Sequence, residues 1–282
     1  ALTLEGVDDQ VNLTAVTLPS GDSERTISAW VRVSANSDVE NQVILGYGEN
    51  VNGERFSFRL DGIATQRLRL EVAGGFIVGT TQINDGQWHH VAVVIKDFNA
   101  NNTTNVNEAK LYVDGNLEAI TSSGSRAINT SANGGAAIGA SLHADNYNFK
   151  GDIDEIHVYN SAKTDAEITA DVYSELAVGY TEAGFPELAE SNAISNIIDR
   201  PTRARAYLDS AVELDALGDT DQANAFRTKA IAQYNAYIAE IGITNIRSTD
   251  ALFYLEAVRS YVTAQQSEDA TALLSVIPLY AD

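Results

Sequence analysis

Residues 84–95 read Asn-Asp-Gly-Gln-Trp-His-His-Val-Ala-Val-Val-Ile, and this stretch decides the fold. Asn, Asp and Gly favour a turn, and the apolar residues after them predict a strand over 88–95. Residues 91–95 are apolar without interruption, whereas a strand with one face in solvent alternates apolar and polar residues. We therefore expect this strand to be covered on both faces, inside a layered β structure.

Short runs of β-forming residues flank this strand at intervals near ten residues, from Ala1 to about Tyr159. Gly, Asn and Asp separate the runs, which is the pattern of a β-sandwich or jelly roll. Asp114-Gly115 indicates a type I′ hairpin, because Gly accepts the positive φ that this turn needs. The predicted strands are residues 26–33, 42–47, 56–60, 67–72, 88–95, 110–113, 116–120, 136–138 and 155–159.

The hydrophobic period becomes helical after Tyr159. Residues 164–167 (Thr-Asp-Ala-Glu) form a capping box, which predicts a short helix to about Glu175. Apolar residues then recur at helical spacing up to Gly218, and again from Asp219 to Ile241. Two further helices are expected over residues 248–262 and 267–277.

This change of period predicts a multidomain chain, with an antiparallel β-sandwich followed by an all-α helical bundle. The expected divisions are a jelly-roll domain over residues 1–176, a Gly-containing connector over 177–186, and a helical bundle over 187–282.

The composition is strongly acidic, with 39 Asp and Glu against 18 Lys and Arg and a net charge of −21. Such a chain repels nucleic acid and anionic membranes, so neither is an expected partner. The absence of cysteine excludes disulfides, thiolate zinc sites and cysteine nucleophiles. An acidic chain without methionine or cysteine suits exposure to oxidation outside the cell, so we expect a secreted or cell-surface protein of a bacterium or archaeon.

Five segments of the first 175 residues occur in a characteristic order: residues 4–11, 26–31, 84–93, 111–115 and 149–160, followed by the cap at 164–168. In this order they resemble the laminin-G-like, concanavalin A-like jelly-roll superfamily, specifically its bacterial LamG-like modules. The resemblance implies two antiparallel sheets of six or seven strands each. It also implies ligand binding at loops on the rim or on the concave face.

The resemblance further implies a structural calcium ion. In many members the first turn of the chain lies beside the turn near residue 151, and carboxylates and carbonyls there hold Ca²⁺. The predicted ligands here are Asp154, Asp152, Asp8, Asp9 and Glu5. Asp154 is the best single ligand, because it interrupts a strand rich in Ile and Val. The alternative is that these Asp side chains bond only to the backbone of their own turns.

His89 and His90 are neighbours on the predicted strand 88–95, so their side chains point to opposite faces and cannot hold one metal ion together. We expect structural roles for both. Trp30 and Trp88 lie mid-strand among apolar residues, which favours core packing over a sugar-stacking role.

Aromatic residues in turn-rich segments are better candidates for a sugar site. Residues 143–148 (His-Ala-Asp-Asn-Tyr-Asn) offer a ring that can stack on a sugar and polar groups that can bind its hydroxyls. Phe76 follows two glycines in a similar segment. The alternative is a polar loop with a partly packed tyrosine. The predicted ligand-binding residues are Tyr147, Asn148, Asn146, Asp145, Tyr47 and His143.

The sequence lacks several hydrolase patterns. Family 16 glucanases, which share the fold class, carry Glu-x-Asp-x-x-Glu on one strand, and no predicted strand here contains it. The patterns Gly-x-Ser-x-Gly and His-Glu-x-x-His are also absent. We therefore predict a non-catalytic recognition or adhesion protein that binds a glycan or a cell-surface protein.

Two alternatives remain open at the level of sequence. The first is a structural subunit of a cell-surface layer, fibre or pilus that self-assembles through the helical domain. The second is an accessory part of an enzyme whose catalytic partner lies on another chain.

Overall fold

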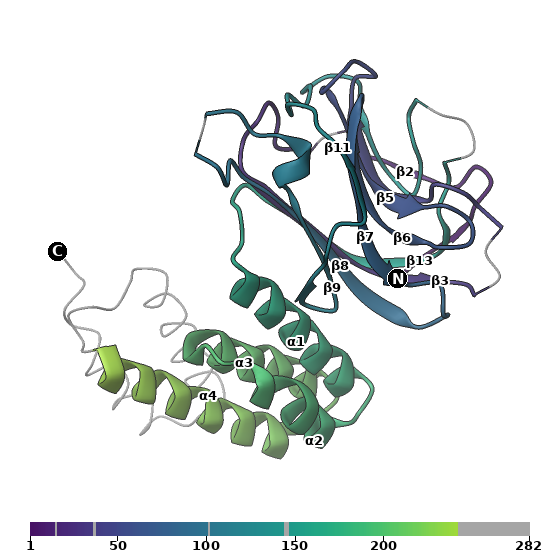
Figure 1. Ribbon diagram of the computed structural model, residues 1–282. Helices are drawn as coiled ribbons and strands as arrows, with labels where there is room; N and C mark the ends of the chain where they lie inside the picture. Colours follow the sequence, from purple (N-terminus) through teal and green to yellow (C-terminus); the bar gives the residue numbers. More distant parts are fainter. Residues whose placement is uncertain (15, 36–37, 101, 144–146, 242–282) are drawn as a thin grey trace. The chain divides into compact units, whose positions relative to one another are not determined.

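The computed structural model describes residues 1–14, 16–35, 38–100, 102–143 and 147–241. The chain divides into two compact units, Ala1–Ile168 and Thr169–Asp282. Figure 1 shows the first unit built from strands and the second, where it is described, from helices. A search of the described helices finds none with the length and hydropathy needed to cross a membrane.

The first unit is an antiparallel β-sandwich of two sheets, as predicted. The six-stranded sheet has the order β1-β13-β3-β8-β9-β10, and the seven-stranded sheet has the order β11-β7-β6-β5-β4-β12-β2. The elements are β1 (Leu2–Glu5), β2 (Val11–Asn12), β3 (Arg25–Val33), β4 (Val43–Gly48), β5 (Arg55–Asp61), β6 (Arg67–Val72), β7 (Gly75–Gln82), β8 (Trp88–Ile95), η1 (Val106–Glu108), β9 (Lys110–Val113), β10 (Asn116–Leu117), β11 (Ser122–Gly124), β12 (Ala136–Ile138) and β13 (Lys150–Tyr159).

The core between the sheets takes every second residue of the strands that line it. In β6, whose sequence is RLRLEV, the two leucines and the valine are fully buried in this core. The two arginines and the glutamate therefore lie on the opposite face of the seven-stranded sheet. In the same way β5 (RFSFRLD) buries two phenylalanines and a leucine and turns its charged residues outward. We call this surface the outer face of the seven-stranded sheet.

Strand β8 is covered on both faces, which confirms the prediction from its unbroken apolar run. Its odd-numbered residues join the main core, and its even-numbered residues pack into a smaller cluster on the other side of the six-stranded sheet. The former are Val91, Val93 and Ile95, and the latter, Ala92 and Val94, meet Tyr112 and Ile168.

The two tryptophans do not lie in the core, contrary to the prediction. Ile27, Ala29, Val31 and Val33 of β3 point into the main core. Strand alternation therefore directs Trp30 outward, and Trp88 is directed outward in the same way on β8. Both indole rings are half-buried. Apolar neighbours in the sequence do not decide which face a side chain occupies, because the two-residue period of the strand does.

The structure confirms the turn and the helix cap that were predicted from local sequence. Asp114 and Gly115 both have positive φ, 50° and 78°, as a type I′ turn requires. Thr164 and Glu167 exchange the two hydrogen bonds of a capping box, at 3.3 and 2.7 Å. Strand β7 was not predicted, and Phe76 lies on it rather than in a loop.

The second unit packs its helices around a cluster rich in alanine and aromatic residues. Gly218 has a φ of 84° and ends α3, and Asp219 accepts a hydrogen bond from the backbone of Gln222 at 3.1 Å to begin the next helix, as predicted. The helical elements are α1 (Asp165–Glu182), α2 (Pro186–Leu188), η2 (Ala189–Ala193), η3 (Ile194–Asn196), α3 (Arg200–Ala216) and α4 (Thr220–Ile241).

Helix α1 is longer than predicted. It continues past Glu175 to Glu182, because Ala177 is buried in the helical cluster and the next residue with positive φ is Gly184. Part of the expected connector over 177–186 is therefore helical. The domain boundaries themselves stay a prediction, and the helices expected over 248–262 and 267–277 lie outside the described residues.

Candidate functional site

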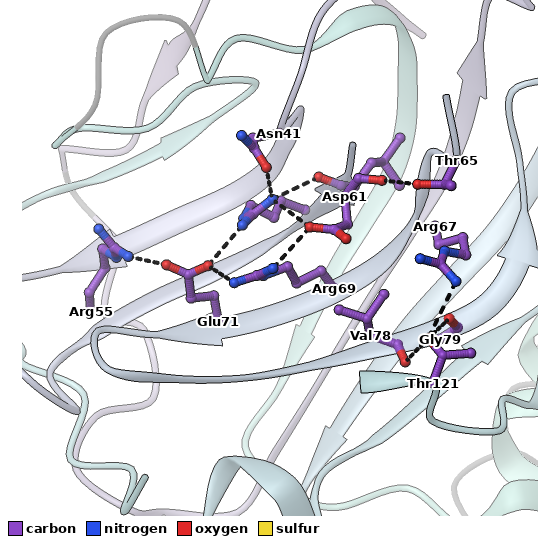
Figure 2. A network of polar contacts seen from close by, with 12 residues as sticks. Asn41, Arg55, Asp61, Thr65, Arg67, Arg69, Glu71, Val78, Gly79 and Thr121 are labelled. Carbon is purple, nitrogen blue, oxygen red and sulfur yellow. Dashed lines mark hydrogen bonds and ion pairs between the residues drawn. The ribbon is translucent and has the colours of Figure 1, made fainter. Parts of the chain in front are cut away.

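Four arginines gather on the outer face of the seven-stranded sheet, and we call them the arginine cluster: Arg55, Arg59, Arg67 and Arg69. Two come from β5 and two from β6, and these strands are neighbours in an antiparallel pair in which Arg59 lies opposite Arg69. The two-residue period places them all on the same face. Figure 2 shows Arg55, Arg69 and Arg67 on this surface, with Arg67 apart from the other two.

Glu71 holds three members of the cluster in place. Its carboxylate accepts hydrogen bonds from Arg59, at 2.8 Å, and from Arg55, and it forms an ion pair with Arg69 at 2.6 Å. Asp61 adds a second anchor, 2.9 Å from Arg69 and 3.6 Å from Arg59. These contacts form the network of dashed lines in Figure 2.

The network is only partly open to solvent. The side chain of Arg59 is 4% exposed, and those of Arg69 and Glu71 are 17% and 15% exposed. Burial alone raises the pKa of Glu71, but Arg59, Arg69 and Arg55 together outweigh it and hold that pKa below its ordinary value. Burial, with the neighbouring charge of Arg69, lowers the pKa of the Arg59 guanidinium. The arginines thus hold Glu71 ionised at neutral pH.

Two aromatic rings flank the cluster. The guanidinium of Arg69 lies over the ring of Phe76, 4.0 Å from its centroid, and that of Arg59 lies 5.4 Å from the ring of Tyr147. Stacked guanidinium groups are held flat and lose less freedom when they bind a ligand. Tyr147, predicted from its loop as a sugar-stacking residue, therefore lies next to the arginine cluster.

The other residues predicted to bind a ligand differ in where the structure places them. His143 lies 2.6 Å from the backbone oxygen of Gly48 through its Nε2, and Asn148 donates to the backbone oxygen of Val7. Both tie loop segments to the sandwich. Asp145 and Asn146 lie outside the described residues.

Tyr47 is not available to a ligand, contrary to the prediction. Its side chain is 4% exposed in the main core, where its ring packs 4.8 Å from that of Phe56. Its hydroxyl accepts from Arg25 at 2.9 Å. Tyr47 ends the predicted strand 42–47 and precedes the turn-forming residues 48–50, but residues 43–48 form β4, and its alternation directs Tyr47 inward.

The segments expected to hold calcium do lie side by side, because β1 pairs with β13. Three of their carboxylates, however, have partners within the chain. Asp152 accepts from Thr3 at 2.7 Å and from Arg32 at 2.8 Å, and Asp9 accepts from the backbone of Glu5 at 2.7 Å. Asp8 is exposed, and Asp154 accepts a hydrogen bond from the backbone of Glu155.

These carboxylates do not converge on one point. Within the described ranges there is no group of three or more His, Asp and Glu side chains that could hold a metal ion. Asp9 fits the alternative, because it bonds to the backbone of its own turn, whereas Asp152 bonds to the side chains of Thr3 and Arg32. The calcium ion remains a prediction from the resemblance.

The paired histidines occupy opposite sides of β8. His89 lies between Asp114 at 2.8 Å and Asp85 at 3.2 Å, and the hydrogen bond to Asp114 raises its pKa despite partial burial. His90 is fully buried, with its ring edge against Trp30 at 5.6 Å between centroids. Burial lowers the pKa of His90 to about 4. These contacts agree with the structural roles predicted for both.

Sequence reasoning missed the arginine cluster. The signal was present in residues 67–71 (Arg-Leu-Arg-Leu-Glu), where charged residues alternate with leucine in a predicted strand. Counting charge by domain hid it, because the domain as a whole is acidic. Counting charge by strand face would have found it, since the period of two assigns each residue to a face.

The chemistry of this face favours binding over acid catalysis. A glycosidase needs one carboxyl group with a raised pKa to act as a general acid. Glu71, at the centre of the network, has a lowered pKa and three arginine partners. A rigid array of guanidinium donors with flanking rings is suited to hold polar groups of a ligand in fixed positions.

Comparison with known proteins agrees with this fold. A family model described as the concanavalin A-like lectin/glucanases superfamily matches residues 5–169. No curated protein matches the chain.

Two solved structures illustrate the likeness. The CBM40 of the Ruminococcus gnavus IT-sialidase is 14% identical with a TM-score of 0.42, over 58% of this chain and 97% of that one. A native heptameric SAP-like pentraxin from Limulus polyphemus is 15% identical with a TM-score of 0.42, over 60% of this chain and 80% of that one. Likeness at this level does not bear on what this chain binds.

Proposed function

The chain belongs to the concanavalin A-like lectin/glucanase superfamily, and from this premise we propose that its β-sandwich is a non-catalytic glycan-binding module. The ligand lies on the outer face of the seven-stranded sheet, across β5 and β6. The observation that carries the proposal is the arginine cluster itself, a fixed set of donors flanked by Phe76 and Tyr147.

The two kinds of group on this face suit a sugar. Aromatic rings bind the C–H face of a pyranose, and charged, prepositioned side chains form the stronger hydrogen bonds to its polar substituents. Glu71 and Asp61 set the positions of the guanidinium groups before the ligand arrives, so little side-chain entropy is lost on binding.

A role outside the cell belongs to the same proposal. Glycans on cell surfaces or in an extracellular matrix are the partners that a non-catalytic module of this kind would hold. The helical unit then serves another purpose, such as attachment or assembly, which the described helices leave open.

The test is a glycan panel probed with the purified chain and with Tyr147→Ala. Its ring packs on Arg59, so we expect the substitution to weaken binding at least tenfold while the far-ultraviolet circular dichroism stays unchanged. Tyr147→Phe keeps the ring and should keep most of the affinity. Tyr159→Ala, which removes a ring from a strand of the other sheet, is the matched control and should bind normally. Absence of binding to every glycan in the panel, or equal binding by Tyr147→Ala, would contradict the proposal.

A further inference from the structure

The charge of the outer face is opposite to that of the chain. Four arginines stand there against two carboxylates, Glu71 and Asp61, whereas the whole chain carries 39 acidic and 18 basic residues. A chain with a net charge of −21 repels anions in general. A local excess of positive charge on such a chain is therefore a feature that needs a physical reason.

The two carboxylates do not serve all four arginines. Glu71 and Asp61 take their ion pairs from Arg55, Arg59 and Arg69. Arg67 makes no ion pair with any described residue, although Asp61 is its cross-strand neighbour in the register. Its one polar contact is a 3.4 Å hydrogen bond from Nη1 to the hydroxyl of Thr121. Figure 2 shows Arg67 at the edge of the network beside that threonine.

Each arginine of the cluster also keeps one donor unused. The Nε atoms of Arg55, Arg59, Arg67 and Arg69 are buried and have no hydrogen-bond partner among the described residues. These Nε atoms are closed to the surface, so a ligand on this face would meet the outer nitrogens, Nη1 and Nη2, of the guanidinium groups. The two Nη atoms of a guanidinium can donate parallel hydrogen bonds to a carboxylate or sulfate.

From these observations, and resting on the proposed function, we infer that the glycan is acidic and that Arg67 is the residue that binds its anionic group. The group is a carboxylate or a sulfate carried on a sugar ring. Arg69, stacked on Phe76, lies on the same strand face two residues away and adds positive charge beside it. Neutral sugar substituents would leave the charge of Arg67 without a counterion.

The experiment is titration calorimetry with three kinds of polysaccharide. The neutral probe is laminarin, the carboxylated probe is polygalacturonate and the sulfated probe is dextran sulfate. We expect one or both acidic probes to bind at least tenfold more tightly than laminarin. Raising sodium chloride from 50 to 500 mM should weaken that binding, because exposed charges are screened.

Variants assign the effect to a residue. Arg67→Gln should lower the affinity for the acidic probe at least tenfold and leave the melting temperature within a degree or two, because Arg67 has no ion pair to lose. Arg205→Gln on α3 is the matched control, since it removes the same charge from an exposed i,i+4 pair with Asp209. It should not change the affinity.

The outcomes separate the two proposals. If the acidic probes bind and Arg67→Gln abolishes the preference, the inference stands. If laminarin binds as well as the acidic probes, or Arg67→Gln binds them normally, the acidic ligand is refuted while glycan binding survives. If none of the three binds and the wider glycan panel is also negative, the proposed function itself fails.

Discussion

Two arginine sites in the same sandwich differ in how their donors are used. Arg25, at the start of β3, is fully buried and donates through all three guanidinium nitrogens to oxygens of its own chain. They are the backbone oxygens of Ser23, Pro19 and Gly21 and the hydroxyls of Tyr47 and Thr130. The arginines of the cluster, by contrast, bond through their outer nitrogens, and the Nε of each has no partner in the described part of the chain.

The difference teaches how to distinguish structural from functional arginines. Arg25 needs no ligand, because the segment 19–23 wraps around it and satisfies its donors. The cluster is satisfied only in part, because Glu71 and Asp61 pair with three of its arginines and Arg67 has no ion pair with a described residue. A count of unused donors therefore separates the two sites better than charge or burial does, since Arg59 is almost as buried as Arg25.

The largest expected effect is on the free energy of unfolding, at the structural site around Arg25. Arg25→Met should lower the free energy of unfolding by about 4 kcal/mol, because several buried oxygens lose a charged donor at once. Urea denaturation measures it. Lys96→Met, which removes an exposed ion pair with Glu24, is the control and should change stability by less than about 1 kcal/mol. A loss of less than about 1 kcal/mol for Arg25→Met would contradict the structural role of Arg25.

Glu71→Gln tests the second site of this comparison, the arginine cluster. It leaves three arginines without their shared anion, and we expect a loss of about 3 kcal/mol at pH 7. The pKa of Glu71 is lowered in the folded state, so its contribution is full above the unfolded pKa near 4.5 and is lost as pH falls through the folded value.

Denaturation of the wild type and Glu71→Gln at several pH values checks this sign. The difference between the two proteins should be largest at neutral pH and should shrink below about pH 4.5. A difference that grows on acidification would mean that Glu71 is not held ionised by the arginines.

The two histidines of β8 also change stability with pH, by a smaller amount than Glu71 or Arg25. The folded pKa of His90 is about 4, below its ordinary 6.5, so the unfolded state binds the proton first. Stability should fall as pH drops from 6.5 to 4, by about 2 kcal/mol. His89 acts in the opposite direction, because its raised pKa adds stability at low pH that is lost as pH rises.

His90→Gln should therefore flatten the fall in melting temperature between pH 6.5 and 4, and His89→Gln should steepen it. Differential scanning calorimetry across that range measures both. Identical pH profiles for the two variants would show that burial does not separate these neighbouring imidazoles.

The smallest effect concerns the carboxylates near the first turn. Asp152 and Asp9 already accept hydrogen bonds within the chain, whereas the resemblance implies a calcium ion there, and the melting temperature in EDTA decides between the two. An unchanged melting temperature would contradict the calcium ion. A fall of several degrees that excess Ca²⁺ reverses would establish the calcium ion that the resemblance implies.

Sequence patterns predicted the layers and the local signals of this molecule well. The unbroken apolar run of residues 91–95, the turn at Asp114-Gly115 and the cap at Thr164 each depend on neighbours within a few residues, and all were confirmed. The pairing of β1 with β13 followed from the resemblance, because no local pattern links residues 150 positions apart.

The site was harder to predict, because it depends on which face a side chain occupies. Tyr47 and the two tryptophans were assigned by the character of their neighbours, and the strand alternation placed each of them on the other side. Tyr147 was identified by its loop, but its contact with Arg59 requires β5 to lie beside a segment almost ninety residues away. The arginine cluster becomes visible only when β5 and β6 are paired in register.

The most direct test follows the Nε–H groups of the arginines by nuclear magnetic resonance while an acidic oligosaccharide, such as trigalacturonate, is added. The resonance of Arg67 should shift in a saturable way, with those of its neighbours in the cluster, and that of Arg25 should stay in place. Saturable binding that moves no resonance of the cluster, or that moves Arg25 alone, would contradict the assignment of the outer face as the glycan site.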